Sequence, residues 1–434
     1  MATEAVVGID RELSTNAEPR RHSVALLGFG TVGRAVAGIL QKRRFSHLGV
    51  THIFNRNVTQ KKVGWLDGSI CWSEDIDRVL TSNVDVVVEA LGGVEPARTW
   101  VQAALEAGKS VVTSNKQLVA RHGPELLAAA HRNGCRFLFG ASVAGVVPVI
   151  AALEQGLSGD HIESISGILN GTCNYVLTQM EAGLSLAAAI KRAQELGYAE
   201  ADPTDDVEGH DACAKLVILA RVGLHRELAL EEVACTAISR VQPIDFEYAH
   251  DLDCTIRQVS CAAAEHNEVF GVVAPMLVPR SSRLASAQGC QNVLVARGLF
   301  GGDTVFAGAG AGGDATAVAV ISDLLSLTSG GAPSRQLMPL QPRSRIGDPQ
   351  TAHYLRFVVR DRPGIVAGIS GVLAKHGINV DAVLQKPGYR RNELPFVITA
   401  EACSGARLNA AIDEIAQFDF LVEPPLTLRI FAGD

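Results

Sequence analysis

The sequence lacks the features that mark membrane proteins and nucleic-acid-binding proteins. It holds no uninterrupted apolar run of about 18 residues, the length that a membrane span requires. Basic residues do not predominate, because 39 Lys and Arg stand against 46 Asp and Glu, and a net charge of -7 disfavours nucleic-acid partners. Residues 1–20 are polar and lack the apolar run of a secretion signal, so we expect a cytoplasmic protein with no membrane partner.

Cysteines are few and scattered. The nine cysteines form no CxxC pair, so buried reduced thiols are expected in place of a zinc site. The 434 residues, 47% hydrophobic and 20% charged, are typical of a soluble globular protein with two or three domains.

The first part of the chain alternates short apolar strands with helical stretches. After a polar tail at 1–20, strands are expected at 23–27, 50–54, 84–89, 110–113 and 136–139. Helical spacing recurs at 97–107 and 124–132. Such alternation predicts an α/β domain over 21–146, with a doubly wound parallel sheet covered on both faces.

The remainder of the chain has a different pattern. Helices are expected at 186–196 and 206–220, and strands of another sheet at 255–264 and 269–278. Residues 329–350, rich in Pro, Gly, Ser and Arg, indicate a linker. The last unit, 351–434, is a small α+β layer with expected elements at 354–359, 366–376, 378–385, 395–400, 408–417 and 426–431.

A glycine-rich turn follows the first strand. Gly28 allows a tight turn, Gly30 removes a Cβ from the path of a phosphate, and Gly33 lets the next helix pack closely on the strand. The backbone N–H groups of such a turn meet a pyrophosphate at the helix N-terminus. We therefore expect a bound dinucleotide, and a purely structural glycine turn is the alternative.

The end of the second strand bears on which dinucleotide binds. Arg56 lies between two asparagines there, and Lys61 and Lys62 follow. An arginine accommodates the 2′-phosphate of NADP, whereas NAD sites often carry an acid at this point. NADP is therefore favoured over NAD, and a solvated basic loop is the other interpretation.

Two polar stretches indicate a second group of functional residues. Residues 113–116 end in Lys116 at the carboxyl edge of the sheet, where ligands of such folds bind. An acidic loop at 197–206 leads into a helix on which Asp211 and Lys215, four residues apart, share a face. Such a pair is usually a solvated surface ion pair, but the apolar character of this helix and the acidic loop before it count against that interpretation.

Taken together, these stretches resemble homoserine dehydrogenases. The likeness rests on 28–33, 113–116, 141–145, 167–175 and 197–215, in this order. The unit at 351–434 resembles an ACT domain, marked by 361–364 and 377–380. The implied fold is a Rossmann-type nucleotide domain at 21–146, to which 306–328 returns, an α+β catalytic and dimerisation domain at 147–305, and a C-terminal ACT (ferredoxin-like) domain.

The resemblance implies that NAD(P) serves the interconversion of L-homoserine and aspartate 4-semialdehyde, in threonine, methionine and isoleucine biosynthesis. Lys215 takes the position of the proton donor in aldehyde reduction, and Lys116 lies beside substrate and nicotinamide. A free lysine has a pKa of about 10.4, which a second ammonium group would lower and Asp211 would raise. The substrate-pocket positions of the family are matched by Glu200, Asp206 and Asp211.

The resemblance also assigns cofactor and ion ligands. The cofactor positions are matched by Gly28, Phe29, Gly30, Thr31, Val32, Gly33, Arg56, Ser114, Lys116 and Gly312. A structural sodium ion of the family is held by backbone carbonyls, here those of Gly140, Val143, Gly145 and Val147. The family usually has Glu in place of Gly140 and Gly in place of Val146. Carbonyl ligands tolerate such changes, although Val146 would strain a loop that needs a positive φ there.

Assembly and regulation follow from the same resemblance. Members are dimeric or tetrameric through the middle domain, so a homodimer or homotetramer is expected. Long members use the ACT domain for feedback by an amino acid, typically threonine. Deletion from about residue 350 onward should then leave basal activity and remove feedback, since a linker precedes that point. Only a short tail precedes Arg21, so we expect no fused aspartate kinase.

Three alternatives compete with this interpretation. A D-2-hydroxyacid dehydrogenase of the phosphoglycerate type also joins nucleotide and ACT domains, but its nucleotide domain lies in mid-chain. Aspartate semialdehyde dehydrogenase needs a nucleophilic cysteine with a base, and no cysteine here lies in an equivalent motif. A non-enzymatic sensor of nucleotide and amino acid would leave the stretches around Lys116 and Lys215 with no reason to coexist.

Overall fold

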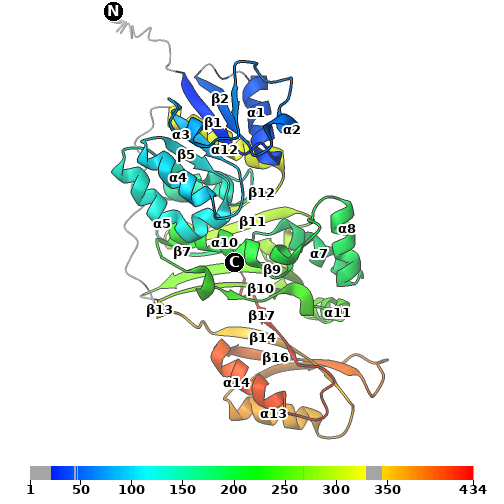
Figure 1. Ribbon diagram of the computed structural model, residues 1–434. Coiled ribbons are helices and arrows are strands. Elements are labelled where there is room, and N and C mark those ends of the chain that lie inside the picture. The colour runs from blue at the N-terminus through cyan, green and yellow to red at the C-terminus, as the bar shows by residue number, and fades with distance from the viewer. Residues whose placement is uncertain (1–20, 44, 46, 267, 329–344, 434) are drawn as a thin grey trace, which may run out of the picture.

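The N-terminal part of the molecule, at the top of Figure 1, is built on a parallel sheet. This sheet has six strands in the order β3-β2-β1-β4-β5-β6. The computed structural model describes residues 21–43, 45, 47–266, 268–328 and 345–433. The tail 1–20 and most of the linker 329–350 therefore lie outside the described residues. The strands of this sheet are β1 (His22–Leu27), β2 (Leu48–Phe54), β3 (Cys71–Ser73), β4 (Val86–Glu89), β5 (Ser110–Thr113) and β6 (Phe137–Leu138).

Helices connect and cover these strands. They are α1 (Thr31–Arg43), α2 (Val58–Lys61), α3 (Asp77–Leu80), α4 (Ala97–Glu106), α5 (Lys116–Arg132) and the late α12 (Gly313–Thr328). Buried side chains of α12, among them Val320 and Leu324, share a core with Val24 and Val36 of β1 and α1. The parallel pairings and crossover helices confirm the doubly wound fold.

Two local expectations about this sheet were wrong. The strand β3 was not foreseen, and the helix expected at 124–132 begins eight residues earlier, at Lys116. It begins there because Asn115 caps it, its side chain accepting the Leu118 N–H at 3.1 Å. Pro124 lies inside α5 and does not start it. The strands expected at 84–89 and 136–139 are real but shorter.

A second sheet of 11 strands spans the rest of the molecule. Its order is β12-β11-β7-β9-β10-β17-β14-β16-β15, and two short strands, β8 (Ala234–Cys235) and β13 (Arg345–Ile346), pair with β10. The strands before the linker are β7 (Ile162–Ile168), β9 (Cys254–Glu265), β10 (Glu268–Pro279), β11 (Gln291–Gly298) and β12 (Gly302–Ala309). Those after it are β14 (Thr351–Val359), β15 (Val380–Leu384), β16 (Leu394–Cys403) and β17 (Leu426–Ile430).

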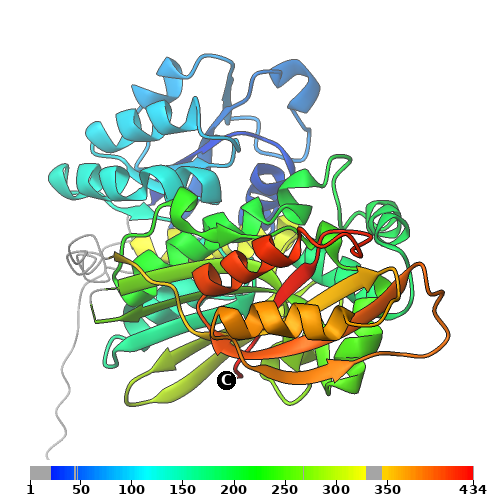
Figure 2. The same cartoon turned by 90° about the horizontal axis from the view of Figure 1, so that it is seen from below.

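The C-terminal unit is joined to the rest through this sheet. Strand β17 pairs with β10 in parallel, so that Met276 faces Arg429 and Leu277 faces Ile430. Helices α13 (Ile365–Lys375) and α14 (Gly405–Ile415), orange and red in Figure 2, lie in front of the strands of this unit. Tyr354 and Leu428 are buried in one core with Leu277. Deletion from about residue 350 onward would remove part of this shared core, and the effect of that deletion on basal activity and feedback stays a prediction.

The helix expected at 206–220 is two helices. The first is α9 (Thr204–Val207), the second is α10 (His210–Leu219), and a π-helical turn at Ala220–Leu224 follows. The break falls at Gly209, whose φ of 88° is left-handed and cannot continue an α-helix. The apolar spacing runs through the break, which is why the pattern indicated a single helix. The remaining helices of eight or more residues here are α7 (Gly171–Glu181), α8 (Leu186–Glu195) and α11 (Pro243–Asp251).

The two sheets meet through α5 and α10. Leu118 and Leu126 of α5 are buried in the same apolar core as Leu216 and Leu219 of α10. That packing brings the first turn of α5 against the first turn of α10. Across the described ranges, we find no helix with both the length and the apolar character needed to cross a membrane.

Candidate active site

The centre of the site is the carboxylate of Asp211, which lies between two lysines. Lys116 Nζ is 2.9 Å from Asp211 Oδ1, and Lys215 Nζ is 2.7 Å from Oδ2. Asp211 is only 7% exposed. The sequence indicated an Asp211–Lys215 pair on one helical face, and the fold adds Lys116 from the start of α5. The interpretation as a solvated surface pair is therefore wrong.

The charges of this cluster stabilise one another. Burial alone would raise the pKa of the Asp211 carboxyl, but the ammonium groups of Lys215 and Lys116 outweigh burial and hold that pKa well below its usual range. In return, Asp211 raises the pKa of Lys116 against the opposing effect of burial. The Asp211 carboxylate thus affects the pKa of Lys116 more strongly than burial does. The Lys116 side chain is therefore an ammonium group at neutral pH.

A loop between β7 and α7 completes the cluster. Asn170 caps α7 by accepting the Cys173 N–H at 2.7 Å, and its Nδ2 donates to Asp211 Oδ2 at 2.8 Å and to Asp206 Oδ1 at 2.7 Å. The carbonyl of Leu169 accepts Lys215 Nζ at 2.8 Å. Burial raises the pKa of the Asp206 carboxyl, and its bond to Asn170 opposes this. Asn170 is a site residue that the sequence reasoning missed, although an Asn before a helix is a recognisable cap.

The glycine turn after β1 has the geometry that a dinucleotide needs. Gly28 has a φ of 99°, and a Cβ on Gly33 would lie 2.2 Å from the Gly28 carbonyl oxygen. A Cβ on Gly30, by contrast, would meet no atom within 4 Å. The turn thus requires glycine at two positions for packing and leaves open space at the third, where a phosphate would sit. These residues fit a dinucleotide.

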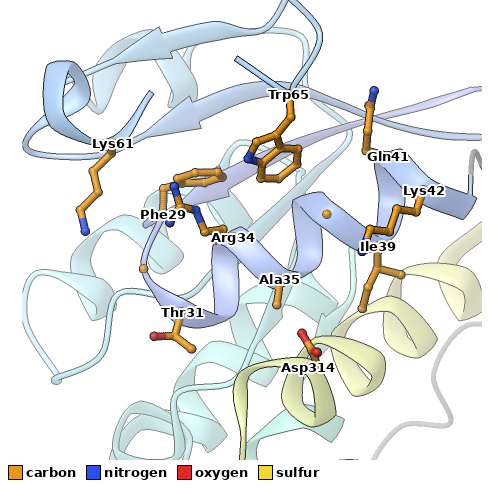
Figure 3. A pocket seen from close by; sticks show the side chains of 12 residues that line it. Phe29, Thr31, Arg34, Ala35, Ile39, Gln41, Lys42, Lys61, Trp65 and Asp314 are labelled. Carbon is orange, nitrogen blue, oxygen red and sulfur yellow. The ribbon is translucent and has the colours of Figure 1, made fainter. Parts of the chain in front are cut away.

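A pocket of about 1000 Å³ opens beside this turn (Figure 3). Its lining is Phe29, Gly30, Thr31, Arg34, Ala35, Gly38, Ile39, Gln41, Lys42, Lys61, Trp65 and Asp314. The Arg34 guanidinium lies 5.9 Å from the centre of the Phe29 ring. Lys61, which the sequence already placed near the cofactor, lines this pocket, and Arg34 and Trp65 are candidate cofactor contacts that the sequence reasoning did not assign, because only the fold brings α1 and the stretch after β2 together.

The other expected cofactor residues surround the same edge of the sheet. Arg56 is exposed just after β2, and the neighbouring Asn55 Oδ1 accepts the Phe29 N–H at 3.4 Å. Ser114 lies in the turn between β5 and α5. Gly312, with a φ of 115°, lies just before α12. Val32, unlike its neighbour Thr31, is not among the residues that line the pocket.

The turn that carries Ser114 is held by a buried carboxyl group. Glu89, fully buried at the end of β4, accepts the Leu91 N–H at 2.8 Å and the Thr113 hydroxyl at 2.5 Å. Asn115 Nδ2 donates to the Gly93 carbonyl at 2.6 Å. Burial raises the pKa of Glu89. These bonds fix the start of α5 and therefore the place of Lys116.

Glu200 lies apart from the Asp211 cluster. It is exposed on the loop between α8 and α9, and its backbone carbonyl accepts Gln194 Nε2 at 3.1 Å. In the described chain, the hydrogen bonds of Asp211 reach Lys116, Lys215 and Asn170 but not Glu200. Its role in substrate binding stays a prediction.

The loop expected to hold sodium contains Gly140 and Val146, the two positions at which this chain departs from the family pattern. The positive φ values fall at Ala144 (59°) and Gly145 (58°), not at Val146, so Val146 does not strain the loop. A Cβ on Gly140 would lie 2.8 Å from Asp323 Oδ1, and Asp323 Oδ2 accepts the Gly140 N–H at 2.9 Å. The side chain of Asp323 thus occupies the space that glycine leaves free. Among the residues with described positions, no cluster of three or more His, Cys, Asp or Glu could hold a metal ion.

Comparison with known protein families gives three matches along the chain. Residues 28–140 match the model of the homoserine dehydrogenase NAD-binding domain, residues 148–325 that of homoserine dehydrogenase, and residues 353–420 that of the ACT domain.

Individual relatives agree with these matches. The chain is 34% identical to homoserine dehydrogenase of Bacillus subtilis over 94% of this chain and 98% of the relative, and 36% identical to that of Mycobacterium tuberculosis over 94% and 97%. A crystal structure of the Thiobacillus denitrificans enzyme matches with a TM-score of 0.88 at 33% identity, covering 95% of this chain and 98% of the other. A hyperthermophilic archaeal homoserine dehydrogenase solved with NADPH matches with a TM-score of 0.63 at 27% identity, covering 73% and 100%.

Proposed function

Because the chain belongs to the homoserine dehydrogenase family, an NAD(P)-dependent group of oxidoreductases, we propose that Lys215 exchanges the proton of the substrate hydroxyl. The observation that carries the proposal is the position of its ammonium nitrogen, 2.7 Å from a carboxylate that also holds Lys116. An alcohol that is oxidised must lose its O–H proton, and an aldehyde that is reduced must gain one. Lys215 is 12% exposed, which limits competition from water.

The cofactor supplies the hydride chemistry when it is bound. What the chain supplies is position and charge. Lys116, kept as an ammonium group by Asp211, stabilises negative charge that develops on the substrate oxygen. A carboxylate has about four acceptor sites, and Asp211 uses three of them on Lys116, Lys215 and Asn170. The remaining acceptor site, together with Asp206, is suited to the ammonium group of homoserine, and we propose Glu200, from the loop before α9, as a further substrate ligand.

For the cofactor we infer NADP in preference to NAD. Support comes from the basic residues near the glycine turn: Arg56 is exposed after β2, and Arg34 and Lys61 line the pocket. A 2′-phosphate adds close to two negative charges, which such residues stabilise. The solved relative that holds NADPH is consistent with this preference.

A sodium ion at the loop after β6 is a further proposal. Its ligands would be the carbonyl oxygens of Gly140, Val143, Gly145 and Val147. The Val147 carbonyl also accepts the Val149 N–H at 2.8 Å, which leaves it one lone pair for an ion. The ion would stiffen the loop and take no part in proton transfer.

The C-terminal unit matches an ACT domain, a type of domain that binds regulatory ligands. We propose that threonine is the ligand of this unit. We also propose that the protein is cytoplasmic and that it assembles as a homodimer or homotetramer through the middle sheet. Threonine added to the full-length enzyme should lower the rate of homoserine oxidation, whereas serine or leucine at the same concentration should not. Equal effects of all three amino acids would contradict the assignment.

The reaction itself is tested by the absorbance of the reduced cofactor. The full-length enzyme with NADP and L-homoserine should produce NADPH. The same enzyme with 3-phosphoglycerate, or with no substrate, should produce none. Turnover of 3-phosphoglycerate in place of homoserine would contradict the proposal.

A further inference from the structure

A buried arginine joins the two helices that carry the catalytic lysines. Arg221, 2% exposed, lies in the π-helical turn that directly follows α10. Its Nη1 donates to the Val119 carbonyl at 2.7 Å, and its Nη2 donates to the Ala120 carbonyl at 3.0 Å, both in α5. Glu227 balances its charge, accepting Nη2 at 3.0 Å and Nε at 3.4 Å. A buried guanidinium group with these partners has one well-defined place.

Helix α5 has two residues that make room for this guanidinium group. Pro124 has no N–H, so the Ala120 carbonyl, four residues earlier, lacks its usual helical donor, and Arg221 supplies one. A Cβ on Gly123 would lie only 2.5 Å from Arg221 Nη1. In a helix interior, glycine costs about 1 kcal/mol and proline about 3 kcal/mol relative to alanine. Together, Gly123 and Pro124 weaken α5, and they create a binding site for the Arg221 guanidinium group.

This binding site for the Arg221 guanidinium group lies one helical turn from the active site. Lys116 begins α5, whereas Val119 and Ala120 lie on its next turn; on the other helix, Lys215 is six residues before Arg221. The helices are therefore joined twice. One connection is the ion pair of Lys116 with Asp211, in which the lysine is 37% exposed, and the other is the buried arginine. A partly exposed lysine pair is a weak constraint, whereas a planar guanidinium with two acceptors fixes both distance and angle.

The connection crosses from one functional part to the other. Helix α5 lies in the segment that matches the NAD-binding domain, residues 28–140, and Arg221 lies in the segment that matches the catalytic domain, residues 148–325. We propose that Arg221 is a positioning residue that sets the distance between the nucleotide part and the substrate part, so that Lys116 and Lys215 share Asp211. This inference rests on the proposed roles of the two lysines.

The test compares three variants in the full-length enzyme. Arg221→Ala removes the guanidinium group, Arg221→Lys keeps a charge without the planar fork, and Gly123→Ala crowds the guanidinium without removing it. A misplacement of about 1 Å can cost about 100-fold in rate. We therefore expect kcat per folded enzyme to fall at least about 10-fold in each variant, with the KM for NADP changed less than about 2-fold. The basic limb of the kcat–pH profile should shift in each as well, because Lys116 and Asp211 separate.

Combining the substitutions at Arg221 and Gly123 distinguishes a positioning role of Arg221 from a purely structural role. Gly123→Ala should lower kcat in the parent and have little further effect in the Arg221→Ala background, where no guanidinium fills the space. Matched controls are Gly371→Ala, a helical glycine with open space around it, and Arg257→Lys, a buried arginine that binds Glu181. Both controls should keep the parental kcat and pH profile.

Two outcomes have different meanings. If the Arg221 and Gly123 variants lose thermal stability but keep the parental kcat and pH profile per folded enzyme, the positioning role is wrong. Lys215→Met is measured in parallel: if it retains turnover, the proton-transfer role fails, whatever the Arg221 variants do. If Arg221→Ala does not fold, Gly123→Ala alone decides, because its chain keeps every charged group.

Discussion

At the scale of single residues, the site depends on one buried carboxylate that two cations share. Removing a charge from water is costly unless partners compensate for it, and Asp211 has two ammonium groups and an amide within 2.9 Å. This arrangement keeps Lys116 charged, and together with the Leu169 carbonyl it holds Lys215 by two hydrogen bonds. Its consequence is that the three side chains behave as one unit, so that a change in one alters the others.

The substitution Asp211→Asn tests that coupling. Because the Asp211 charge raises the pKa of Lys116, its removal should lower that pKa, and the basic limb of the kcat–pH profile should move to lower pH. We also expect kcat/KM for homoserine to fall by about 10- to 100-fold, since Asp211 contributes both position and charge. Rate profiles from pH 6 to 11 measure both effects. A profile that superimposes on the parental one would show that Asp211 does not control Lys116.

The substitution Arg56→Ala tests the cofactor preference. The KM for NADP should rise by about 10-fold, which corresponds to about 1.4 kcal/mol, because one charge-assisted contact with the 2′-phosphate is lost. The KM for NAD should change little, since NAD has no such phosphate. Arg78→Ala, an exposed arginine on α3, is the matched control. An equal rise for NAD and NADP would show that Arg56 does not contact the 2′-phosphate.

Sequence reasoning found those site residues whose chemistry shows in local patterns. Gly28, Gly33, Asp211 and Lys215 lie in motifs with fixed spacing. Residues that enter the site through tertiary packing gave no such signal. Arg221, for example, contacts α5 only because two helices distant in sequence pack together.

At the scale of elements, strands and long helices followed the hydrophobic pattern, whereas their ends followed single residues. The strands expected at 23–27 and 110–113 agree with β1 and β5 to within one residue. The start of α5 depends on the Asn115 cap, and the break before α10 depends on Gly209. A hydrophobic pattern averages over a turn of helix and does not register a single left-handed residue.

Replacement of Gly209 tests the importance of that break. Its φ is 88°, and a Cβ there would lie 2.8 Å from Cys235 Sγ. Gly209→Ala should therefore lower the free energy of unfolding by about 1–3 kcal/mol, as urea denaturation measures it. Gly68→Ala, which has open space and no left-handed φ, is the control and should change it by less than about 0.5 kcal/mol. Equal stability of the two variants would contradict the role of the break.

At the scale of the whole molecule, one sheet runs from the catalytic part into the ACT unit. The pairing of β17 with β10 is accompanied by a buried polar network between β14 and α11. In it, Arg356 Nη1 lies 3.2 Å from Asp245 Oδ2, and the Tyr354 hydroxyl donates to Oδ1 at 2.8 Å. Both Arg356 and Asp245 are almost fully buried. A ligand that moved the ACT strands would therefore act on strands of the middle part through this shared sheet.

Truncation at residue 350 tests this continuity. Removal of the ACT unit exposes Leu277, Ile256 and Tyr248, which pack against Tyr354 and Leu428 in the intact chain. We expect the truncated chain to lose basal activity and to unfold at a temperature at least about 5 °C lower, as calorimetry measures it. Full basal activity with an unchanged unfolding temperature would restore the simpler view of a detachable regulatory unit.

The most direct test of the central claim is the turnover of two Lys215 variants. Lys215→Arg keeps a cation beside Asp211 but exchanges protons poorly, and Lys215→Met keeps the length of the side chain without a charge. General acid–base catalysis contributes about 100- to 10,000-fold, so both variants should lose at least about 100-fold in kcat for homoserine oxidation. Their dissociation constants for NADPH, followed by its fluorescence, should stay within about 2-fold of the parent. A kcat close to the parental value in either variant would contradict the assignment of proton transfer to Lys215.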